Sequence, residues 1–339
     1  MNIKELKDSA REKMGSTCRI CPVCNGVVCA GQVPGMGGAG RGRAFQSNIE
    51  ALAAVKFNMR TLHDAKTPSL MTTIFGRQIE MPIIGAPMTG TSINMGGAVT
   101  EREFIKAIVS GCKLAGTLGM TGDTADPTMF EAGVDAIALE QGAGITFIKP
   151  RTDQEEIIKR IRRVEESGAL AVGVDIDGAG LVTMALRGQP VGPKTKAELR
   201  ELINCTKLPF ILKGIMTVDE AEIAAEIGAA AIVVSNHGGR VLDDTPGAAD
   251  VLPEIVEAVK GKIAVYADGG VRTGMDVLKY IALGADAVLV GRPLIHGALG
   301  NGTEGVKLLL DIMANELKQA MLLTGCGTIA DIDDRIIYW

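Results

Sequence analysis

Short apolar runs alternate with amphipathic stretches from about residue 81 to the end of the chain. Each run is typical of a buried strand that stops at Gly, Asp, Lys or Ser, and helical apolar spacing follows it. The pattern predicts eight strands: MPIIGA (81–86), KLAGTLG (113–119), ITFIK (145–149), LAVGVDI (170–176), PFILK (209–213), AAIVVS (230–235), KIAVYAD (262–268) and DAVLVG (286–291).

The stretches between these strands have acidic starts and glycine stops, as in DQEEIIKRIRRVEESG and TVDEAEIAAEIG. Continuously apolar strands separated by helices are typical of parallel sheets that are covered on both faces. Eight such units predict an α/β fold, a closed (β/α)8 TIM barrel, over residues 81–339. An open doubly wound sheet is the alternative, but it does not explain why polar residues end nearly every strand.

Residues 1–80 lie outside this repeat and form a predicted N-terminal extension. It begins with a charged helix, MNIKELKDSAREKM, and continues with a cysteine cluster and a glycine-rich loop. A second helix is predicted over SNIEALAAVKFNMRTL, with Ser47 and Glu50 in the spacing of a capping box. The stretch TPSLMTTIFGRQIEMP predicts a short hairpin that leads into the first barrel strand.

Composition narrows the class of protein. The 339 residues are 47% hydrophobic and carry a net charge of −5, which allows a large buried core. There is no basic stripe with interleaved aromatic residues, so no nucleic-acid partner is expected. The N-terminus lacks the apolar core of a signal peptide and no apolar run reaches membrane-spanning length, so we expect a cytoplasmic protein with reduced cysteines.

Polar residues collect at the predicted strand ends, which face one common mouth in a parallel barrel. The motifs DGGVRTG and VGRP follow the last two strands, where free amides, a helix start and arginine side chains favour a bound phosphate. The residues at the strand ends are Pro87, Met88, Thr89, Lys149, Asp175, Asp177, Lys213, Ser235, His237, Arg240, Asp268, Gly269, Gly270, Arg272, Gly291 and Arg292.

The motifs SNHGGRVLD, LKG, DGGVRTG and VGRP resemble, in this order, signature elements of the FMN-dependent α-hydroxy-acid oxidase and dehydrogenase family, which includes glycolate oxidase and lactate oxidase. The resemblance covers roughly residues 81–330. It implies a TIM barrel that binds FMN at its mouth and oxidises a small 2-hydroxy acid to a 2-oxo acid. It also implies a homo-oligomer, because barrels of this family often assemble as tetramers.

The resemblance assigns roles, and the chemistry of the side chains agrees with them. His237 would take a proton from the substrate, Asp177 would stabilise the cationic form of His237, and Arg240 would bind the substrate carboxylate. Lys213 would lie near the flavin atoms at which negative charge develops on reduction. The other implied FMN contacts are Pro87, Met88, Thr89 and Ser235, Asp268 at the ribityl chain or Arg240, and Gly269, Gly270, Arg272, Gly291 and Arg292 at the phosphate.

Half of the substrate pocket departs from the family pattern. Where the family has Gln and Tyr after strand 3, this chain has Phe147 and Lys149, and a Thr after strand 4 is replaced by Asp175. A second substrate arginine and an N-terminal tyrosine have no counterpart, and the connection from Asp177 to Lys213 is much shorter. Lys149 is expected either to replace a lost carboxylate contact or to serve a different substrate.

Two other functions compete with the oxidoreductase. The stretch APMTG is also similar to type 2 isopentenyl-diphosphate isomerase, a related FMN barrel with non-redox chemistry that lacks the NHGGR pairing. The non-enzyme alternative is a flavin-binding barrel that transfers electrons.

The stretch CRICPVCNGVVC places Cys18, Cys21, Cys24 and Cys29 in a C-x2-C-x2-C-x4-C run. So dense a run resembles ferredoxin-type ligation of a [4Fe–4S] cluster, whereas zinc sites more often use two separated pairs. A cluster, a zinc ion and metal-free thiols stay open as alternatives. The nearby GMGGAGRG has the glycine spacing of a dinucleotide-binding loop but follows no convincing strand, so it predicts a loop over the barrel mouth.

Overall fold

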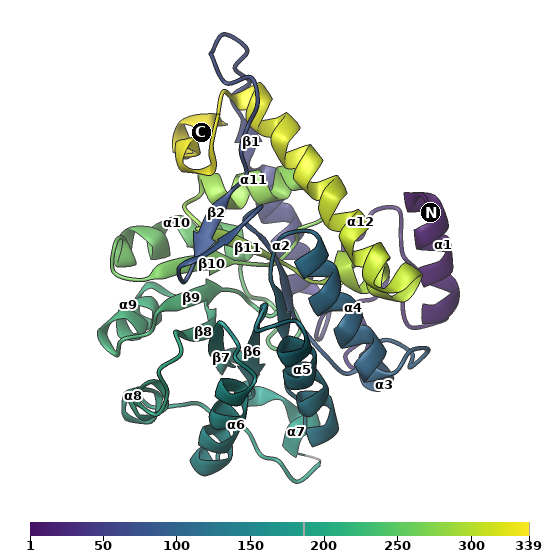
Figure 1. Ribbon diagram of the computed structural model, residues 1–339, viewed down its shortest axis with the longest axis vertical. Coiled ribbons are helices and arrows are strands. Elements are labelled where there is room, and N and C mark those ends of the chain that lie inside the picture. Colours follow the sequence, from purple (N-terminus) through teal and green to yellow (C-terminus); the bar gives the residue numbers. More distant parts are fainter. Residues whose placement is uncertain (186, 339) are drawn as a thin grey trace.

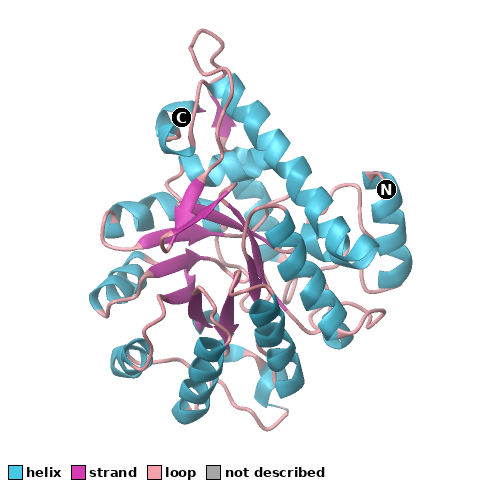
Figure 2. Cartoon of the chain, viewed as in Figure 1, coloured by secondary structure: helices cyan, strands magenta, loops and turns pink. Residues whose placement is uncertain are grey.

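A closed barrel of eight parallel strands forms the centre of the protein. The computed structural model describes residues 1–185 and 187–338. The strands pair in the order β10-β11-β4-β5-β6-β7-β8-β9, and β9 pairs with β10 to close the ring. Figures 1 and 2 show helices around these strands, which confirms the predicted (β/α)8 barrel. The strands are β4 (Ile83–Met88), β5 (Gly119–Thr121), β6 (Gly144–Ile148), β7 (Ala171–Asp175), β8 (Phe210–Ile215), β9 (Ala231–Val234), β10 (Ala264–Ala267) and β11 (Ala287–Val290).

The helices around the barrel begin where the sequence supplies caps. Thr100 and Glu103 form a capping box at the start of α4, and Asp153 accepts hydrogen bonds from the first amides of α6. The backbone of α12 leaves the helical conformation at Asn301 and Gly302, so this element is two helices joined at a break. The helices are α3 (Thr91–Asn94), α4 (Glu101–Leu114), α5 (Pro127–Leu139), α6 (Gln154–Glu166), α7 (Val182–Ala185), α8 (Lys196–Asn204), α9 (Val218–Glu226), α10 (Ala248–Val259), α11 (Gly274–Ala282) and α12 (Arg292–Thr324).

Two apolar layers hold the barrel together. Alternate strand residues point inward and form one buried cluster, in which Phe147 is among the largest side chains, and the others pack outward against the helices. A hairpin of β2 (Thr72–Ile74) and β3 (Arg77–Ile79) adds Ile74 and Ile79 to the inner cluster. The predicted hairpin is therefore confirmed, and it covers the end of the barrel opposite the mouth.

The two N-terminal helices pack on the outside of the barrel. α1 (Ile3–Met14) lies along α12 with Leu6 buried, as Figure 1 shows, and α2 (Arg43–Ala54) packs against α10. Near the C-terminus, β1 (Lys56–Phe57) pairs with β12 (Ile337–Tyr338). Across the described residues, no helix combines the length and apolar character that a membrane crossing requires. The division of the chain at residue 80 stays a prediction.

Two local predictions are wrong. The second strand begins at Gly119, not at residue 113, because α4 continues to Leu114 and the apolar run joins the end of that helix to the start of the strand. Helix α2 begins at Arg43 and ends at Ala54, so Ser47 lies inside it and donates a hydrogen bond to the Arg43 carbonyl oxygen instead of capping the helix.

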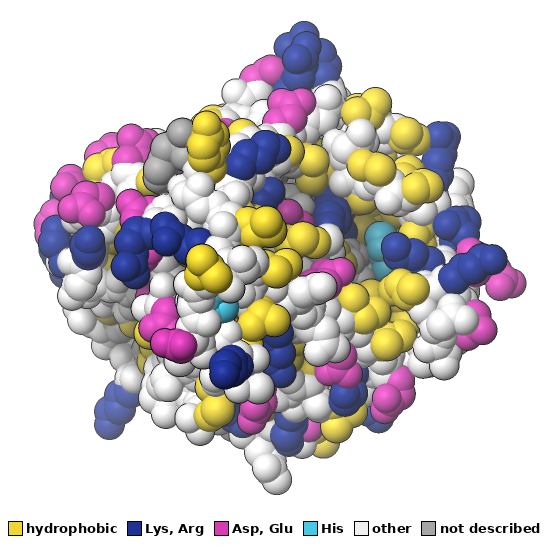
Figure 3. Space-filling model, turned by 90° about the horizontal axis from the view of Figure 1, so that it is seen from above, with side chains coloured by type: hydrophobic (Ala, Val, Ile, Leu, Met, Phe, Trp, Pro, Cys, Tyr) yellow, Lys and Arg dark blue, Asp and Glu magenta, His cyan; other side chains and the backbone are white. Residues whose placement is uncertain are grey.

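The surface carries charges of both signs. On the face drawn in Figure 3, Lys and Arg side chains lie among Asp, Glu and hydrophobic side chains. Several charged side chains of the described residues pair with each other. Arg163, for example, lies 2.9 Å from both Glu131 and Asp135.

Candidate active site

A chain of charged and polar side chains crosses the mouth of the barrel. Lys149 Nζ lies 2.8 Å from Asp175 Oδ2, and Lys213, the neighbour of Asp175 in the strand register, lies 3.8 Å from its other oxygen. Lys213 Nζ donates a hydrogen bond to Ser235 Oγ (3.0 Å), and Ser235 Oγ donates to Asp268 Oδ1 (2.6 Å). All five side chains are buried. Four neighbouring strands, β7 to β10, and the end of β6 thus contribute to one network.

Lys213 is the centre of this network. Burial alone would lower the pKa of Lys213, but the carboxylates of Asp268, Asp177 and Asp175 outweigh burial and raise that pKa above its ordinary range. The ammonium group therefore stays charged at neutral pH. Asp175 Oδ1 is buried and accepts no hydrogen bond within the described residues, so one acceptor of the network is free for a further donor.

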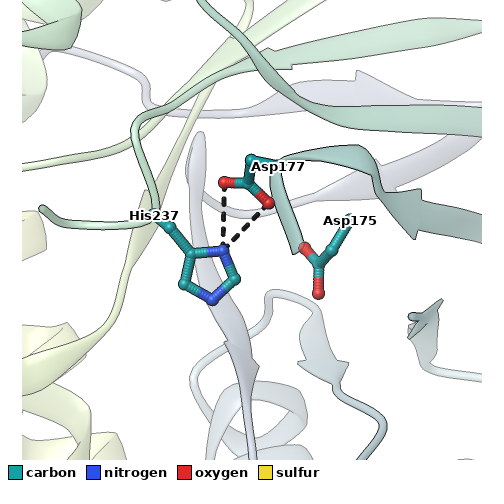
Figure 4. A group of neighbouring side chains, drawn as sticks. All are labelled: Asp175, Asp177 and His237. Carbon is teal, nitrogen blue, oxygen red and sulfur yellow. Dashed lines mark hydrogen bonds and ion pairs between the residues drawn. The ribbon is translucent and has the colours of Figure 1, made fainter. Parts of the chain in front are cut away.

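The backbone after β9 aims His237 into the mouth. His237, Gly238 and Gly239 have φ values of +57°, +63° and +76°, a left-handed run that is uncommon for a non-glycine residue. A Cβ at Gly239 would collide with the backbone of Phe45, so this position requires glycine. As Figure 4 shows, His237 Nδ1 faces both carboxylate oxygens of Asp177, at 3.0 Å each.

Asp177 is held in an ionised state. Burial of its carboxylate would raise its pKa, but the charges of His237 and Lys213 and the hydrogen bond with His237 lower the pKa of Asp177 to about 2. Gly214 of the LKG motif makes room for this side chain, because a Cβ at Gly214 would lie 2.5 Å from the Asp177 Cβ.

Asp175, Asp177 and His237 lie close enough together to ligate a metal ion, with donor atoms within 4.8 Å of one another. The cationic side chains of Lys149 and Lys213 already neutralise the Asp175 carboxylate, however. A divalent cation would therefore meet two ammonium groups, and the arrangement suits proton transfer better than metal binding.

Three arginine side chains form a positively charged cluster beside the histidine. Burial lowers the pKa of Arg292, and the charges of Arg240 and Arg272 lower it further, to about 9. Among the described residues, no carboxylate forms an ion pair with any of the three. Arg272 Nε is buried without a hydrogen-bond partner. A half-buried group of like charges with an unused buried donor fits an anionic ligand.

The N-terminal loop holds two of these arginines in place. Arg292 Nε donates to the Met36 carbonyl oxygen (2.9 Å), and its guanidinium carbon lies 3.9 Å from the centre of the Phe45 ring. Arg240 donates to the Gly37 carbonyl oxygen (3.2 Å) and to Asn94 Oδ1 (3.0 Å). The glycine-rich loop therefore lies over the barrel mouth.

Backbone amides complete the anion site. In the part of the chain that the structure describes, neither the Gly269 nor the Gly270 amide donates a hydrogen bond to a protein group. The first turn of α11 is not available, because Asp276 and Glu316 accept hydrogen bonds from its amides. α12 begins at Arg292, and its N-cap residue Gly291 provides no side-chain cap, so its N-terminus remains for an anion.

Other predicted residues have additional partners. Pro87 and Met88 end β4 at the mouth, and Thr89 Oγ1 donates to Glu101 Oε1 (2.6 Å). The Lys149 ammonium is only 9% exposed and its charge is balanced by Asp175, so a substrate contact for Lys149 stays a prediction.

Sequence reasoning missed a buried cluster around Asp123, just beyond β5. Its carboxylate forms an ion pair with Arg151, lies 3.7 Å from Arg160 Nε and accepts a hydrogen bond from the Lys149 amide (3.0 Å). The cluster fixes the backbone that carries Lys149. Correct placement of the second strand would have revealed Asp123 as one more strand-end carboxylate.

Asn48 was also missed. It is 1% exposed, accepts a hydrogen bond from the Ala248 amide (3.0 Å) and donates to Asn236 Oδ1 (2.7 Å). Asn236 directly precedes His237, so α2 supports the histidine loop from behind. A lone Asn in a helix gives no signal in the sequence.

The residues present fit FMN. The arginine cluster, the free glycine amides and the α12 N-terminus suit its phosphate, and Lys213 offers a permanent positive charge at the centre of the mouth. The free oxygen of Asp175 can accept a hydrogen bond from a polar group of the cofactor or substrate.

Known proteins share this architecture. A model of the FMN-dependent dehydrogenase family matches residues 35–194 and 183–339, two ranges that overlap in the segment joining β7 to β8. 2-Hydroxyacid oxidase 2 of Homo sapiens is 34% identical over 329 residues, which cover 89% of this chain and 91% of that protein. Peroxisomal (S)-2-hydroxyacid oxidase GLO3 of Arabidopsis thaliana is 32% identical over 332 residues, covering 87% and 88%. A crystal structure of mandelate oxidase matches with a TM-score of 0.79 at 27% identity, covering 99% of this chain and 97% of that chain.

Proposed function

Because the chain belongs to the FMN-dependent dehydrogenase family, we propose that it oxidises a 2-hydroxy acid to a 2-oxo acid with His237 as the base. FMN dependence and the oxidation of 2-hydroxy acids are the activity of its relatives. The pairing of His237 with an ionised Asp177 beside an arginine cluster carries the assignment of roles.

The tautomer of His237 follows from the charge of its partner. An ionised carboxylate only accepts hydrogen bonds, so Nδ1 of His237 carries the hydrogen that faces Asp177. Nε2 is then free to accept a proton from the substrate. Asp177 stabilises the imidazolium that results and keeps the ring in one orientation.

The remaining side chains bind and orient the substrate and the cofactor. Arg240 recognises the substrate carboxylate through its guanidinium group, which the 35–37 loop and Asn94 hold in one position. Arg272 and Arg292 hold the FMN phosphate, and Lys213 stabilises negative charge that develops at the mouth. When bound, FMN accepts the electrons of the oxidation.

The two competing functions are less well supported. The relatives named above are oxidases, which does not favour an isomerase related to isopentenyl-diphosphate isomerase. A pure electron-transfer protein would not need a base with an ionised partner. The predicted cytoplasmic location and homo-oligomeric state stay predictions from the sequence.

The experiment is anaerobic reduction of the FMN-loaded protein by glycolate, L-lactate or mandelate. The reduction is monitored as the loss of flavin absorbance. At least one acid is expected to bleach the flavin, and His237→Gln is expected to slow bleaching about 100- to 10,000-fold while FMN stays bound. The matched control is His63→Gln, the same change in a loop outside the mouth. A rate of flavin bleaching in His237→Gln within tenfold of the rate in the unsubstituted protein would overturn the role of His237.

A further inference from the structure

Four cysteines line one cavity at the edge of the arginine cluster. Cys18, Cys21, Cys24 and Cys29 all contribute to its wall, together with Arg292 and His296 at the start of α12. The segment that carries the cysteines has no regular helix or strand, and all four are half-buried with free thiols. The spacing of the four cysteines in the sequence does not by itself require their thiols to line one cavity.

The cavity is built into the fold. Cys18 Sγ lies 3.8 Å from His296 Nε2 and accepts a hydrogen bond from the Ile20 amide (3.4 Å). Arg272 Nη2 donates both to the Cys24 carbonyl oxygen (3.2 Å) and to Cys24 Sγ (3.4 Å). Amide and guanidinium donors to cysteine sulfur are the contacts that stabilise metal-bound thiolates.

The charge around the cavity favours a ligand held by thiolates. Arg272 and Arg292 approach the cysteines without a carboxylate partner among the described residues. Four ionised cysteines would supply negative charge beside these guanidinium groups. A cofactor that binds thiolates therefore relieves the repulsion within the arginine cluster.

The positions of the sulfur atoms do not suit a single zinc ion. Tetrahedral zinc with Zn–S bonds of about 2.3 Å holds its sulfur atoms about 3.8 Å apart. Within the described residues, the cysteine donors do not form a group of three or more within 4.8 Å of one another. A four-iron cluster places iron and sulfide between its ligands and so needs wider spacing, and the C-x2-C-x2-C run is an iron–sulfur pattern.

We propose that Cys18, Cys21, Cys24 and Cys29 bind a [4Fe–4S] cluster. The family model begins its match at Gly35, so all four cysteines precede the residues that this model matches. The inference rests on the cavity, not on the proposed oxidation, but the two sites adjoin because Arg272 contacts Cys24 and belongs to the proposed phosphate site. Loss of the cluster is therefore expected to weaken FMN binding.

The test is metal analysis of the full chain purified without oxygen and supplied with FMN, iron and sulfide. The unsubstituted protein is expected to hold about four irons and four acid-labile sulfides per chain, and to give the electron paramagnetic resonance signal of a reduced cluster after dithionite. Cys24→Ser should lose iron and sulfide and bind FMN less tightly. The control Cys205→Ser, at a half-buried cysteine on the end of α8, should retain both.

Three results would overturn the proposal: one zinc per chain, free thiols without sulfide, or full iron and sulfide in Cys24→Ser. Should Cys24→Ser fail to fold, as judged by circular dichroism, the iron and sulfide content of the unsubstituted protein decides. Flavin bleaching by 2-hydroxy acids is measured on the same samples. Bleaching without iron refutes the cluster alone, and iron without bleaching refutes the proposed oxidation alone.

Discussion

The partnership of Asp177 with His237 gives the sharpest prediction about rate. In Asp177→Asn the shape of the side chain is kept and its charge is lost. The two groups lie 3.0 Å apart, which at an effective dielectric of about 20 corresponds to an attraction of about 5 kcal/mol between imidazolium and carboxylate. Each 1.36 kcal/mol is a factor of ten in rate, so about four orders of magnitude is the upper limit of the loss.

The observed loss should be smaller than this limit, because Asn can still orient the ring through a hydrogen bond. We expect kcat to fall about 100- to 1,000-fold. KM should change little, because the proposed carboxylate contact is made by Arg240. The assay is the anaerobic rate of flavin bleaching across substrate concentrations.

The control is Asp64→Asn, the same change at an exposed residue in the loop before β2. A kcat for Asp177→Asn within tenfold of the unsubstituted protein would refute the electrostatic reasoning. So would a loss confined to KM, since it would move the role of Asp177 from proton transfer to substrate binding.

Three further predictions concern stability. The pKa of Asp177 is lowered from 3.8 to about 2, so its ionisation contributes about 2 kcal/mol to the free energy of unfolding. This contribution is fully present above pH 3.8 and is lost as the pH falls toward 2. The difference in urea midpoint between the unsubstituted protein and Asp177→Asn should therefore shrink over that pH range. Asp123→Ala leaves the buried Arg151 guanidinium unpaired and should cost about 3 to 5 kcal/mol of unfolding free energy, measured by urea denaturation. Gly305→Ala should cost about 2 kcal/mol, because its Cβ would collide with the Gly297 carbonyl oxygen in the facing half of α12; its melting temperature tests this.

Matched controls accompany these variants. Gly180→Ala adds a Cβ where no atom lies within 4 Å, so it should leave the melting temperature nearly unchanged. Asp8→Ala removes a carboxylate from an exposed pair with Arg11 and should cost less than about 1 kcal/mol. Equal losses for Gly180→Ala and Gly305→Ala would contradict the packing argument, and equal losses for Asp8→Ala and Asp123→Ala would contradict the argument from a buried unpaired charge.

The barrel could be predicted because each buried strand carries its own apolar signal. Local hydrophobicity fails where one run spans two elements, as in KLAGTLG, in which the end of α4 and the start of β5 are both apolar. The resulting shift concealed Asp123. Likewise, Ser47 has the spacing of a helix cap, but tertiary packing starts α2 one turn earlier.

The two changes at Lys149 and Asp175 show a different limit. In the sequence they are separate departures from the family pattern, and Lys149 suggests a substrate contact. In the structure they lie 2.8 Å apart and neutralise each other, because β6 and β7 are neighbours. Pairing between residues that are 26 positions apart depends on strand register, which the sequence does not specify.

The contacts of the N-terminal loop could not be foreseen for the same reason. Arg240 reaches Gly37 across 203 positions of the chain, and Arg292 reaches Met36 across 256. The motifs identified the arginines correctly as strand-end residues. The loop carbonyls that orient them lie in a glycine-rich stretch without periodicity.

One face of α12 borders both the cysteine cavity and α1. Arg292, His296 and Gly300 follow each other at intervals of four, so they share a helix face. The first two border the cysteine cavity, while the Gly300 carbonyl accepts a hydrogen bond from Ser9 and a Cβ at Gly300 would lie 2.6 Å from the Leu6 carbonyl oxygen. We therefore expect the cysteine segment and this face of α12 to occur together in related proteins. Relatives that carry the four cysteines are expected to keep a small residue at the position of Gly300, whereas relatives without them are free to enlarge it.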